Sequence, residues 1–168
     1  MLSGWFACGT IVHAETQAPS RDIAEIQVGA GTAFATGNDF SPMAQLHLRY
    51  SFWRTVGLGL YVGGVWMNQE SWHQTTVPLC LRMNLSMPFW QRFEPMASLG
   101  VGGYWGRLKL WNDTITNTTT GGHFALAMLF PGDRWGLGLE AAGHVFGDVQ
   151  YPSEPAVMGT VTATVLFR

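Results

Sequence analysis

The sequence predicts an all-β fold: an eight-stranded antiparallel up-and-down transmembrane β-barrel with a polar, side-chain-filled interior. The first observation is a two-residue alternation, as in VMGTVTATVLF at 157–167, where one face is apolar and the other mostly hydroxyl-bearing. The second is that only 12% of the residues are charged, too few to cover a surface in water, where about 25% is usual. The third is that the alternation recurs about eight times, which allows a closed barrel without free strand edges.

Four strands are expected in the first half of the chain, where large apolar residues alternate with small or polar ones. They occupy residues 22–36, 43–53, 56–68 and 74–86. In the second of these, Leu46 and Leu48 form the apolar face and alternate with His47 and Arg49. The stretch TGND at 36–39 predicts a loop between the first two strands.

Four more strands are expected in the second half of the chain. They occupy residues 93–108, 124–130, 134–146 and 157–167. The Thr- and Asn-rich segment 112–122 is interpreted as an exposed loop, and PGD at 131–133 predicts a turn. Short connections near positions 54, 89 and 132 alternate with longer or more polar ones near 38, 71, 116 and 151. This alternation is typical of outer-membrane barrels, and it predicts that both ends of the chain are periplasmic.

Aromatic residues gather near both ends of the expected strands, where their rings would meet the two interfaces of a bilayer. We therefore predict two aromatic girdles, one at each end of the barrel. They comprise Phe34, Phe52, Trp66, Trp72, Phe93, Trp105, Phe124, Phe130, Trp135 and Phe167.

The less apolar faces carry charged and imidazole side chains that a closed barrel would place inside. The predicted interior network comprises Glu25, His47, Arg49, Arg82, Glu94, Glu140 and His144. An eight-stranded barrel is only wide enough for side chains to fill it, and buried charges have to be paired and hydrogen-bonded. We interpret the network as a structural plug, with a gated proton or ion path as the alternative.

The N-terminal residues 1–14 are similar to a secretory signal. Leu2 to Val12 is mostly apolar, and the following His13-Ala14 completes a small-residue cleavage site, although the usual positively charged start is missing. The expected organisation is a signal peptide at 1–14 and a barrel at 15–168. Removal of the signal would take Cys8 with it and leave Cys80 without a disulfide partner.

Several segments resemble strands of the small outer-membrane β-barrel superfamily, which includes the OmpA transmembrane domain and the OmpX-like proteins. They are TVPL at 76–79, EP at 94–95 with GVG at 100–102, and WGLGLEA at 135–141. The C-terminal segment resembles the strand signal read by the barrel-assembly machinery, except that Arg168 follows the aromatic Phe167. The resemblance implies a monomer in the bacterial outer membrane that contacts the bilayer, lipopolysaccharide and the assembly machinery, and that needs no cofactor.

The function we expect is non-catalytic, either envelope-structural or surface recognition through the loops at 112–122 and 147–155. A net charge of −2 without a basic stripe argues against nucleic-acid binding. One alternative is a soluble lipocalin-like carrier, which would need the apolar faces to point into a cavity. Leu46, Leu79, Leu137 and Val161 distinguish the two arrangements, since they point outward only in the membrane barrel.

A second alternative is a lipid-modifying barrel enzyme, of the lipid A deacylase or acyltransferase type. Such an enzyme needs a Ser hydroxyl in contact with a His. His47 and Ser51 share a strand face but lie about 13 Å apart along it, and the His-x-Ser strand motif typical of the deacylase barrels is missing. No metal site is predicted either: His73, His123 and His144 lack a ligand-like spacing and are expected to be solvated near the loops.

Overall fold

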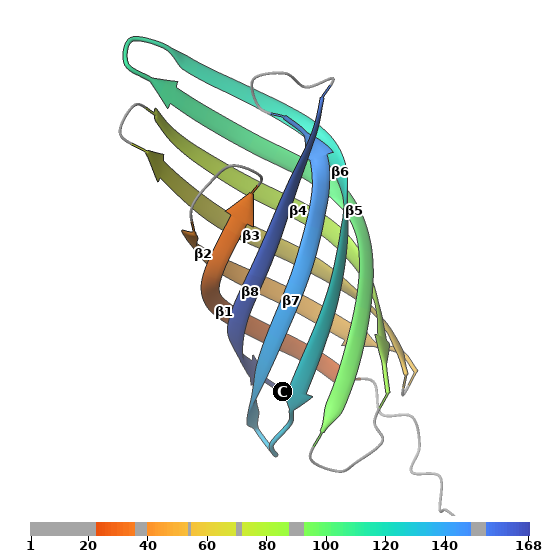
Figure 1. Ribbon diagram of the computed structural model, residues 1–168. Coiled ribbons are helices and arrows are strands. Elements are labelled where there is room, and N and C mark those ends of the chain that lie inside the picture. The colour runs from red at the N-terminus through yellow and green to blue at the C-terminus, as the bar shows by residue number, and fades with distance from the viewer. Residues whose placement is uncertain (1–22, 36–39, 54, 70–71, 88–92, 149–153) are drawn as a thin grey trace, which may run out of the picture.

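The computed structural model describes residues 23–35, 40–53, 55–69, 72–87, 93–148 and 154–168 (Figure 1). Its eight antiparallel strands follow one another around a closed barrel, and the last pairs with the first. They are β1 (Ile23–Ala35), β2 (Ser41–Ser51), β3 (Val56–Gln69), β4 (Trp72–Ser86), β5 (Glu94–Leu110), β6 (Thr114–Phe130), β7 (Trp135–Gly147) and β8 (Pro155–Phe167). The predicted fold class is confirmed. The predicted signal peptide at 1–14 lies outside the described residues.

The two ends of the barrel differ in what they contain. We call the end where β1 begins and β8 ends the turn end; it also holds the β2–β3, β4–β5 and β6–β7 connections. The opposite end, the loop end, holds the other connections. The described residues contain no helix long and apolar enough to span a membrane.

The outer surface of the barrel is apolar. Along β2, every second side chain is buried inside and the ones between are exposed. The exposed fraction is 38% for Leu46, 51% for Leu79, 52% for Leu137 and 47% for Val161, so all four diagnostic residues point outward. In the soluble carrier these side chains would instead line a cavity, which excludes that arrangement. The outward apolar side chains of one strand are paired with outward positions of the next strand, and together they form a continuous apolar band around the barrel.

The interpretation of residues 112–122 as a loop is wrong. β5 and β6 are 17 residues long each, and their pairing continues to Lys109 opposite Thr114. Threonine is β-branched and favours strands, so the polar T-x-T-x-T pattern that resembles a loop by composition is a strand by conformation. The β5–β6 connection therefore occupies only 111–113, while the β4–β5 connection at the turn end occupies 87–93. For these two connections the expected alternation is reversed, because the loop-end connection is the shorter one.

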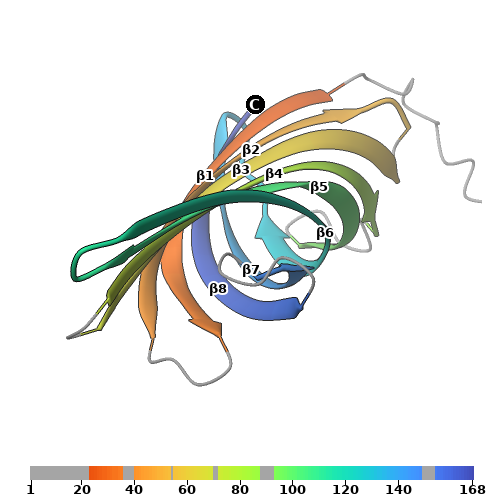
Figure 2. The ribbon, with the colours of Figure 1, turned by 90° about the horizontal axis from the view of Figure 1, so that it is seen from above.

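The paired ends of β5 and β6 form a hairpin that leaves the outline of the barrel. Seen from above, this hairpin extends sideways past the barrel opening (Figure 2). A transmembrane strand needs only about 9–11 residues, so strands of 17 residues reach well beyond an apolar band of that length.

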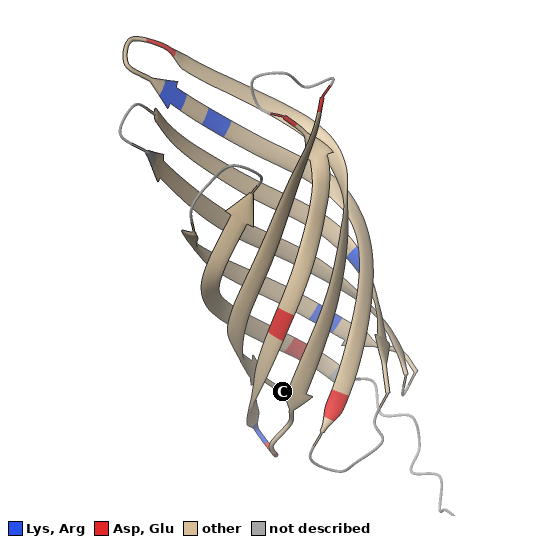
Figure 3. Cartoon of the chain, in the orientation of Figure 1, with Lys and Arg blue, Asp and Glu red and all other residues tan. Residues whose placement is uncertain are grey.

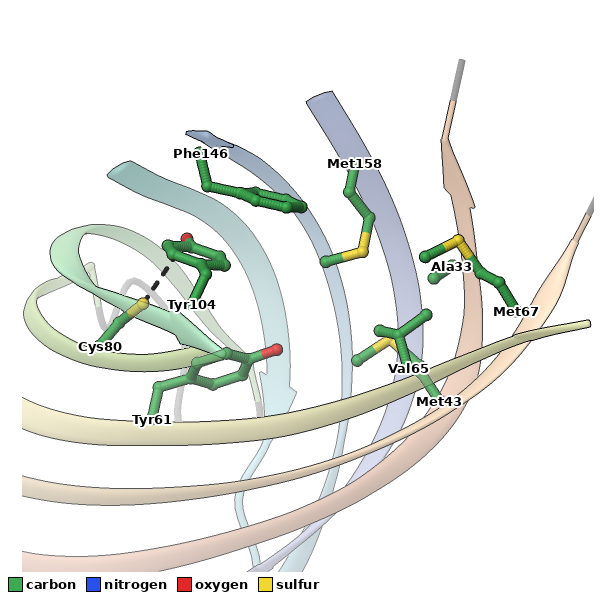
Figure 4. Packing of buried hydrophobic residues seen from close by; sticks show 9 residues of the cluster. All are labelled: Ala33, Met43, Tyr61, Val65, Met67, Cys80, Tyr104, Phe146 and Met158. Carbon is green, nitrogen blue, oxygen red and sulfur yellow. Dashed lines mark hydrogen bonds between the residues drawn. The ribbon is translucent and has the colours of Figure 1, made fainter. Parts of the chain in front are cut away.

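The interior at the loop end contains a large apolar cluster (Figure 4). The buried cluster there, which we call the apolar cap, comprises Ala33, Met43, Tyr61, Val65, Met67, Cys80, Tyr104, Phe146 and Met158. The Phe146 ring stacks on Tyr104 with 4.5 Å between ring centroids. Cys80 is fully buried as a small filler, with its Sγ 3.6 Å from the Tyr104 hydroxyl.

Candidate functional site: the charged interior

Four charged side chains form a closed ring at the turn end. Arg49 of β2 contacts Glu94 of β5 at 2.9 Å and Glu25 of β1 at 3.7 Å. Arg168, which follows β8, contacts the other oxygens of the same two carboxylates, at 2.7 Å for Glu25 and 3.2 Å for Glu94. We call this arrangement the ion ring. Since it contains two cations and two anions, its net charge is zero.

Hydroxyl and amide side chains complete the ion ring. The Gln27 amide donates to Glu25 Oε1 at 2.6 Å, and Arg49 donates to Ser51 Oγ at 3.1 Å and to Ser86 Oγ. Each hydrogen bond offsets part of the cost of removing a charge from water. The ring joins β1, β2 and the end of β8 to β5, so it connects the closure of the barrel to a strand elsewhere in the wall.

Arg168 is the member of the ring that sequence reasoning missed. Its place just past the terminal aromatic was interpreted as a departure from the assembly signal. The signal that could have found it is the alternation itself: Phe167 points outward, so the next side chain points inward. Partial burial lowers the pKa of the Arg168 guanidinium, but hydrogen bonds and attraction from Glu25 and Glu94 raise it further, so its pKa lies above the ordinary value.

A second ion pair occupies the centre of the barrel. Arg82 of β4 and Glu140 of β7 form a bidentate pair with N···O distances of 3.0 and 3.1 Å, and both are buried. The Arg82 guanidinium carbon also lies 3.8 Å from the centroid of the Tyr61 ring. Gln45 of β2 donates to Thr162 of β8 at 2.9 Å and reaches Glu140 at 3.4 Å. Side chains from β2, β3, β4, β7 and β8 therefore meet around one charge pair.

Two buried histidines contact the apolar cap. His123 of β6 and His144 of β7 are registered neighbours, and their Nδ1 atoms are 3.2 Å apart. His144 Nδ1 also lies 3.1 Å from the Tyr104 hydroxyl, and the His123 ring stacks on Tyr61. Both imidazoles are buried, so the expectation of solvated loop histidines is wrong for this pair. β6 extends to Thr114 and so contains His123, whereas His144 faces inward on β7, as its place in the predicted interior network requires.

His47 stands apart from the other members of the predicted network. It is fully buried, yet neither ring nitrogen has a hydrogen-bond partner in the part of the chain that the structure describes. His73 lies on the outer face of β4 and is exposed, with its Nδ1 2.9 Å from Asn68 Oδ1. No three His, Cys, Asp or Glu side chains among the described residues are placed to hold a metal ion.

Most of the aromatic residues assigned to the girdles project from the outer face. The exposed ones are Phe34, Trp66, Trp105, Phe124, Phe130, Trp135 and Phe167. Phe52 and Phe93 are half-buried at the turn end, and the Phe93 ring packs against Phe130. Trp72 differs from the prediction because it packs against the apolar cap inside the barrel. Even-numbered positions of β4 face inward. Because Trp72 occupies such a position, its side chain does not join the outer girdle.

Comparison with solved structures identifies the architecture. Neisserial surface protein A (NspA) superposes with a TM-score of 0.75 at 10% identity, over 86% of this chain and 96% of that one. The N-terminal barrel domain of Pseudomonas aeruginosa OprF follows, with a TM-score of 0.59 at 11% identity over 88% and 100% of the two chains. This chain has the fold of the small outer-membrane β-barrels. The suspected resemblance is thereby confirmed at the level of the fold.

An enzyme is also among the proteins with this fold. The outer membrane enzyme PagL superposes with a TM-score of 0.53 at 10% identity, over 86% of this chain and 99% of that one. No protein-family model and no curated protein sequence matches this chain. At such low identity the structural likeness concerns the fold alone.

Proposed function

We propose that this protein is a non-catalytic barrel of the bacterial outer membrane, with an envelope-structural role and surface recognition at its loop end. The observation that carries this proposal is an apolar outer band closed around a charge-paired interior. An apolar exterior is compatible with lipid and costly in water. In the outer membrane the turn end, with both ends of the described chain, would face the periplasm.

The interior supports a plug rather than a channel. Above the ion ring lies the buried Arg82–Glu140 pair, and above that pair lies the apolar cap. An ion moving along the axis would have to displace paired charges and then cross a layer of methionine, valine and phenylalanine side chains. The gated path considered from the sequence therefore has little support.

The serines near the charged interior are engaged by polar neighbours other than histidine. Ser51 and Ser86 accept hydrogen bonds from Arg49, and the Ser98 hydroxyl donates to Asn84 at 2.8 Å. A serine nucleophile needs an imidazole within about 3.2 Å to take its proton. These contacts favour a non-catalytic protein over the lipid A deacylase or acyltransferase.

Cell fractionation and a lipid assay test the proposal together. We expect the full chain, expressed in a Gram-negative host, to enter the outer-membrane fraction and to migrate differently on a gel before and after boiling. We expect the purified barrel to leave the acyl chains of lipid A unchanged, as read by mass spectrometry. Recovery in the soluble fraction contradicts the membrane location, and loss or gain of one acyl chain contradicts the absence of catalysis.

A further inference from the structure

The outward face of the β5–β6 hairpin and the neighbouring strand β4 carries a polar patch beyond the apolar band. We call it the hairpin patch. It comprises His73, Thr75, Arg107, Lys109, Thr114 and Thr116. Outward side chains occupy odd positions in β4 and β5 and even positions in β6, so all six point to the same side of the wall.

The strand register gives each cation of the patch two polar neighbours. Arg107 lies between Thr75 and Thr116, and Lys109 lies between His73 and Thr114. Directly opposed side chains have their Cβ atoms about 5 Å apart, and the two cations are about 7 Å apart along β5. Hydroxyl and imidazole groups therefore lie within reach of any anion that meets the guanidinium or the ammonium group.

These cations differ from the arginines of the interior and share their exposure with Arg134 at the turn end. Arg49, Arg82 and Arg168 neutralise carboxylates inside the barrel or at its turn end. Arg107 and Lys109 are exposed and form no ion pair with any described residue. Figure 3 shows positively charged positions in blue on the β5 arm of the hairpin, away from the charges of the turn-end half. Their charge is therefore available to a ligand.

The hairpin patch lies next to the loop-end aromatic residues. Arg107 follows the outward Trp105 by two positions on β5, and Thr75 is in register with the outward Trp66 on β3. Aromatic rings of membrane barrels sit at the level of the lipid headgroups, so the next outward residues meet the headgroups themselves. The hairpin also extends sideways past the opening of the barrel (Figure 2). In an outer membrane this would bring it over the surrounding leaflet.

We propose that the hairpin patch binds the phosphate groups of an anionic lipid headgroup in the outer leaflet, namely the phosphates of lipid A in lipopolysaccharide. This inference rests on the proposed outer-membrane location. A guanidinium binds phosphate oxygens through two parallel hydrogen bonds, and an ammonium group adds a point charge. The patch shares its face with the lipid-facing band, which favours a membrane lipid over a soluble polyanion. Two cations are also few for a long anionic chain.

Native mass spectrometry of the refolded full chain in a zwitterionic detergent tests this inference. The probes are bisphosphorylated lipid A and dephosphorylated lipid A with the same acyl chains. We expect the parent protein to bind bisphosphorylated lipid A at least about tenfold more tightly than dephosphorylated lipid A, because hydrogen bonds to charged groups are stronger than those between neutral groups. We expect the double variant Arg107→Gln, Lys109→Gln to lose most of this preference. The matched control is Arg134→Gln, which removes an exposed cation at the turn end and is expected to keep it.

Several results would overturn the inference. One is a double variant that retains the phosphate preference, and another is a control that loses as much as the double variant. A third is loss of sucrose octasulfate binding in the double variant while lipid A binding stays unchanged, which would assign the patch to a soluble polyanion. Heat-modifiable gel mobility separates the two proposals. A barrel that folds without phosphate preference contradicts only the patch, whereas a chain that stays soluble and unshifted contradicts the membrane location as well.

Discussion

The charged side chains of the interior are concentrated in the turn-end half of the barrel, beside a small apolar cluster, whereas the larger cluster of methionine, valine and aromatic side chains lies in the loop-end half. The turn-end half contains the ion ring and leads to the Arg82–Glu140 pair. The loop-end half contains the apolar cap. The His123–His144 pair adjoins this cap, and His144 is hydrogen-bonded to the Tyr104 hydroxyl.

The difference shows how one narrow interior combines two kinds of stabilisation. Ion pairs are directional, so they oppose a shift of one strand against another, but each buried charge depends on its partner. Apolar packing has little directional preference, yet it leaves no polar path through the layer that it fills. A barrel with charges at one end and an apolar cap at the other is therefore both fixed in register and closed.

The largest effect is expected at the central ion pair. Arg82→Met leaves Glu140 buried without its cation, which costs about 3–5 kcal/mol of unfolding free energy. Urea unfolding of the refolded barrel in detergent measures the loss. The double variant Arg82→Met, Glu140→Leu removes both charges and is expected to recover a large part of it. Equal losses in the single and double variants would contradict a role for charge pairing.

The apolar cap is expected to respond to lost volume instead of lost charge. Met158→Ala removes a fully buried side chain of the cap and is expected to cost about 2–5 kcal/mol. The conservative control Met158→Leu keeps the volume and is expected to cost less than about 1.5 kcal/mol. Both are read from the same urea transitions. A loss that changes strongly with salt would contradict an apolar origin, because dispersion and hydrophobic burial carry no charge to screen.

A substitution on the outer, lipid-facing surface provides a comparison for the substitutions in the two halves of the interior. Leu137→Arg places a cation on the apolar band and is expected to cost about 2–4 kcal/mol near the bilayer midplane and to impair folding into lipid. Leu137→Met is the matched control, because it keeps an apolar side chain of similar size. The yield of heat-modifiable protein after refolding into phosphatidylcholine vesicles measures the effect. If the arginine variant folds as well as the parent, the assignment of this face to lipid is wrong.

The strands and their faces could be predicted because strand alternation is a local property. Leu137 and Val161 point outward as expected, since each side chain's face follows from its place in the pattern. The extension of β6 through 114–122 could not be predicted from composition, because threonine is frequent in strands and in polar loops alike.

Partners inside the barrel depend on contacts that are distant in the sequence. Arg82 and Glu140 are 58 residues apart, and their meeting depends on the tilt and closure of the wall. The sequence predicts that both point inward, but alternation alone does not say which acid meets which base. The same holds for Arg168, which reaches Glu25 across 143 residues through the closure of β8 on β1.

The smallest effect is expected at the edge of the ion ring. Arg168→Gln leaves two carboxylates to share Arg49, but the Arg168 side chain is 25% exposed, so water screens part of the contact. We expect a loss of about 1–2 kcal/mol of unfolding free energy, which shrinks as salt is added. The control is Arg134→Gln, an exposed cation at the same end, for which less than about 0.5 kcal/mol is expected. If both variants lose the same amount, the ring is held by Arg49 alone and the C-terminal arginine does not contribute to closure.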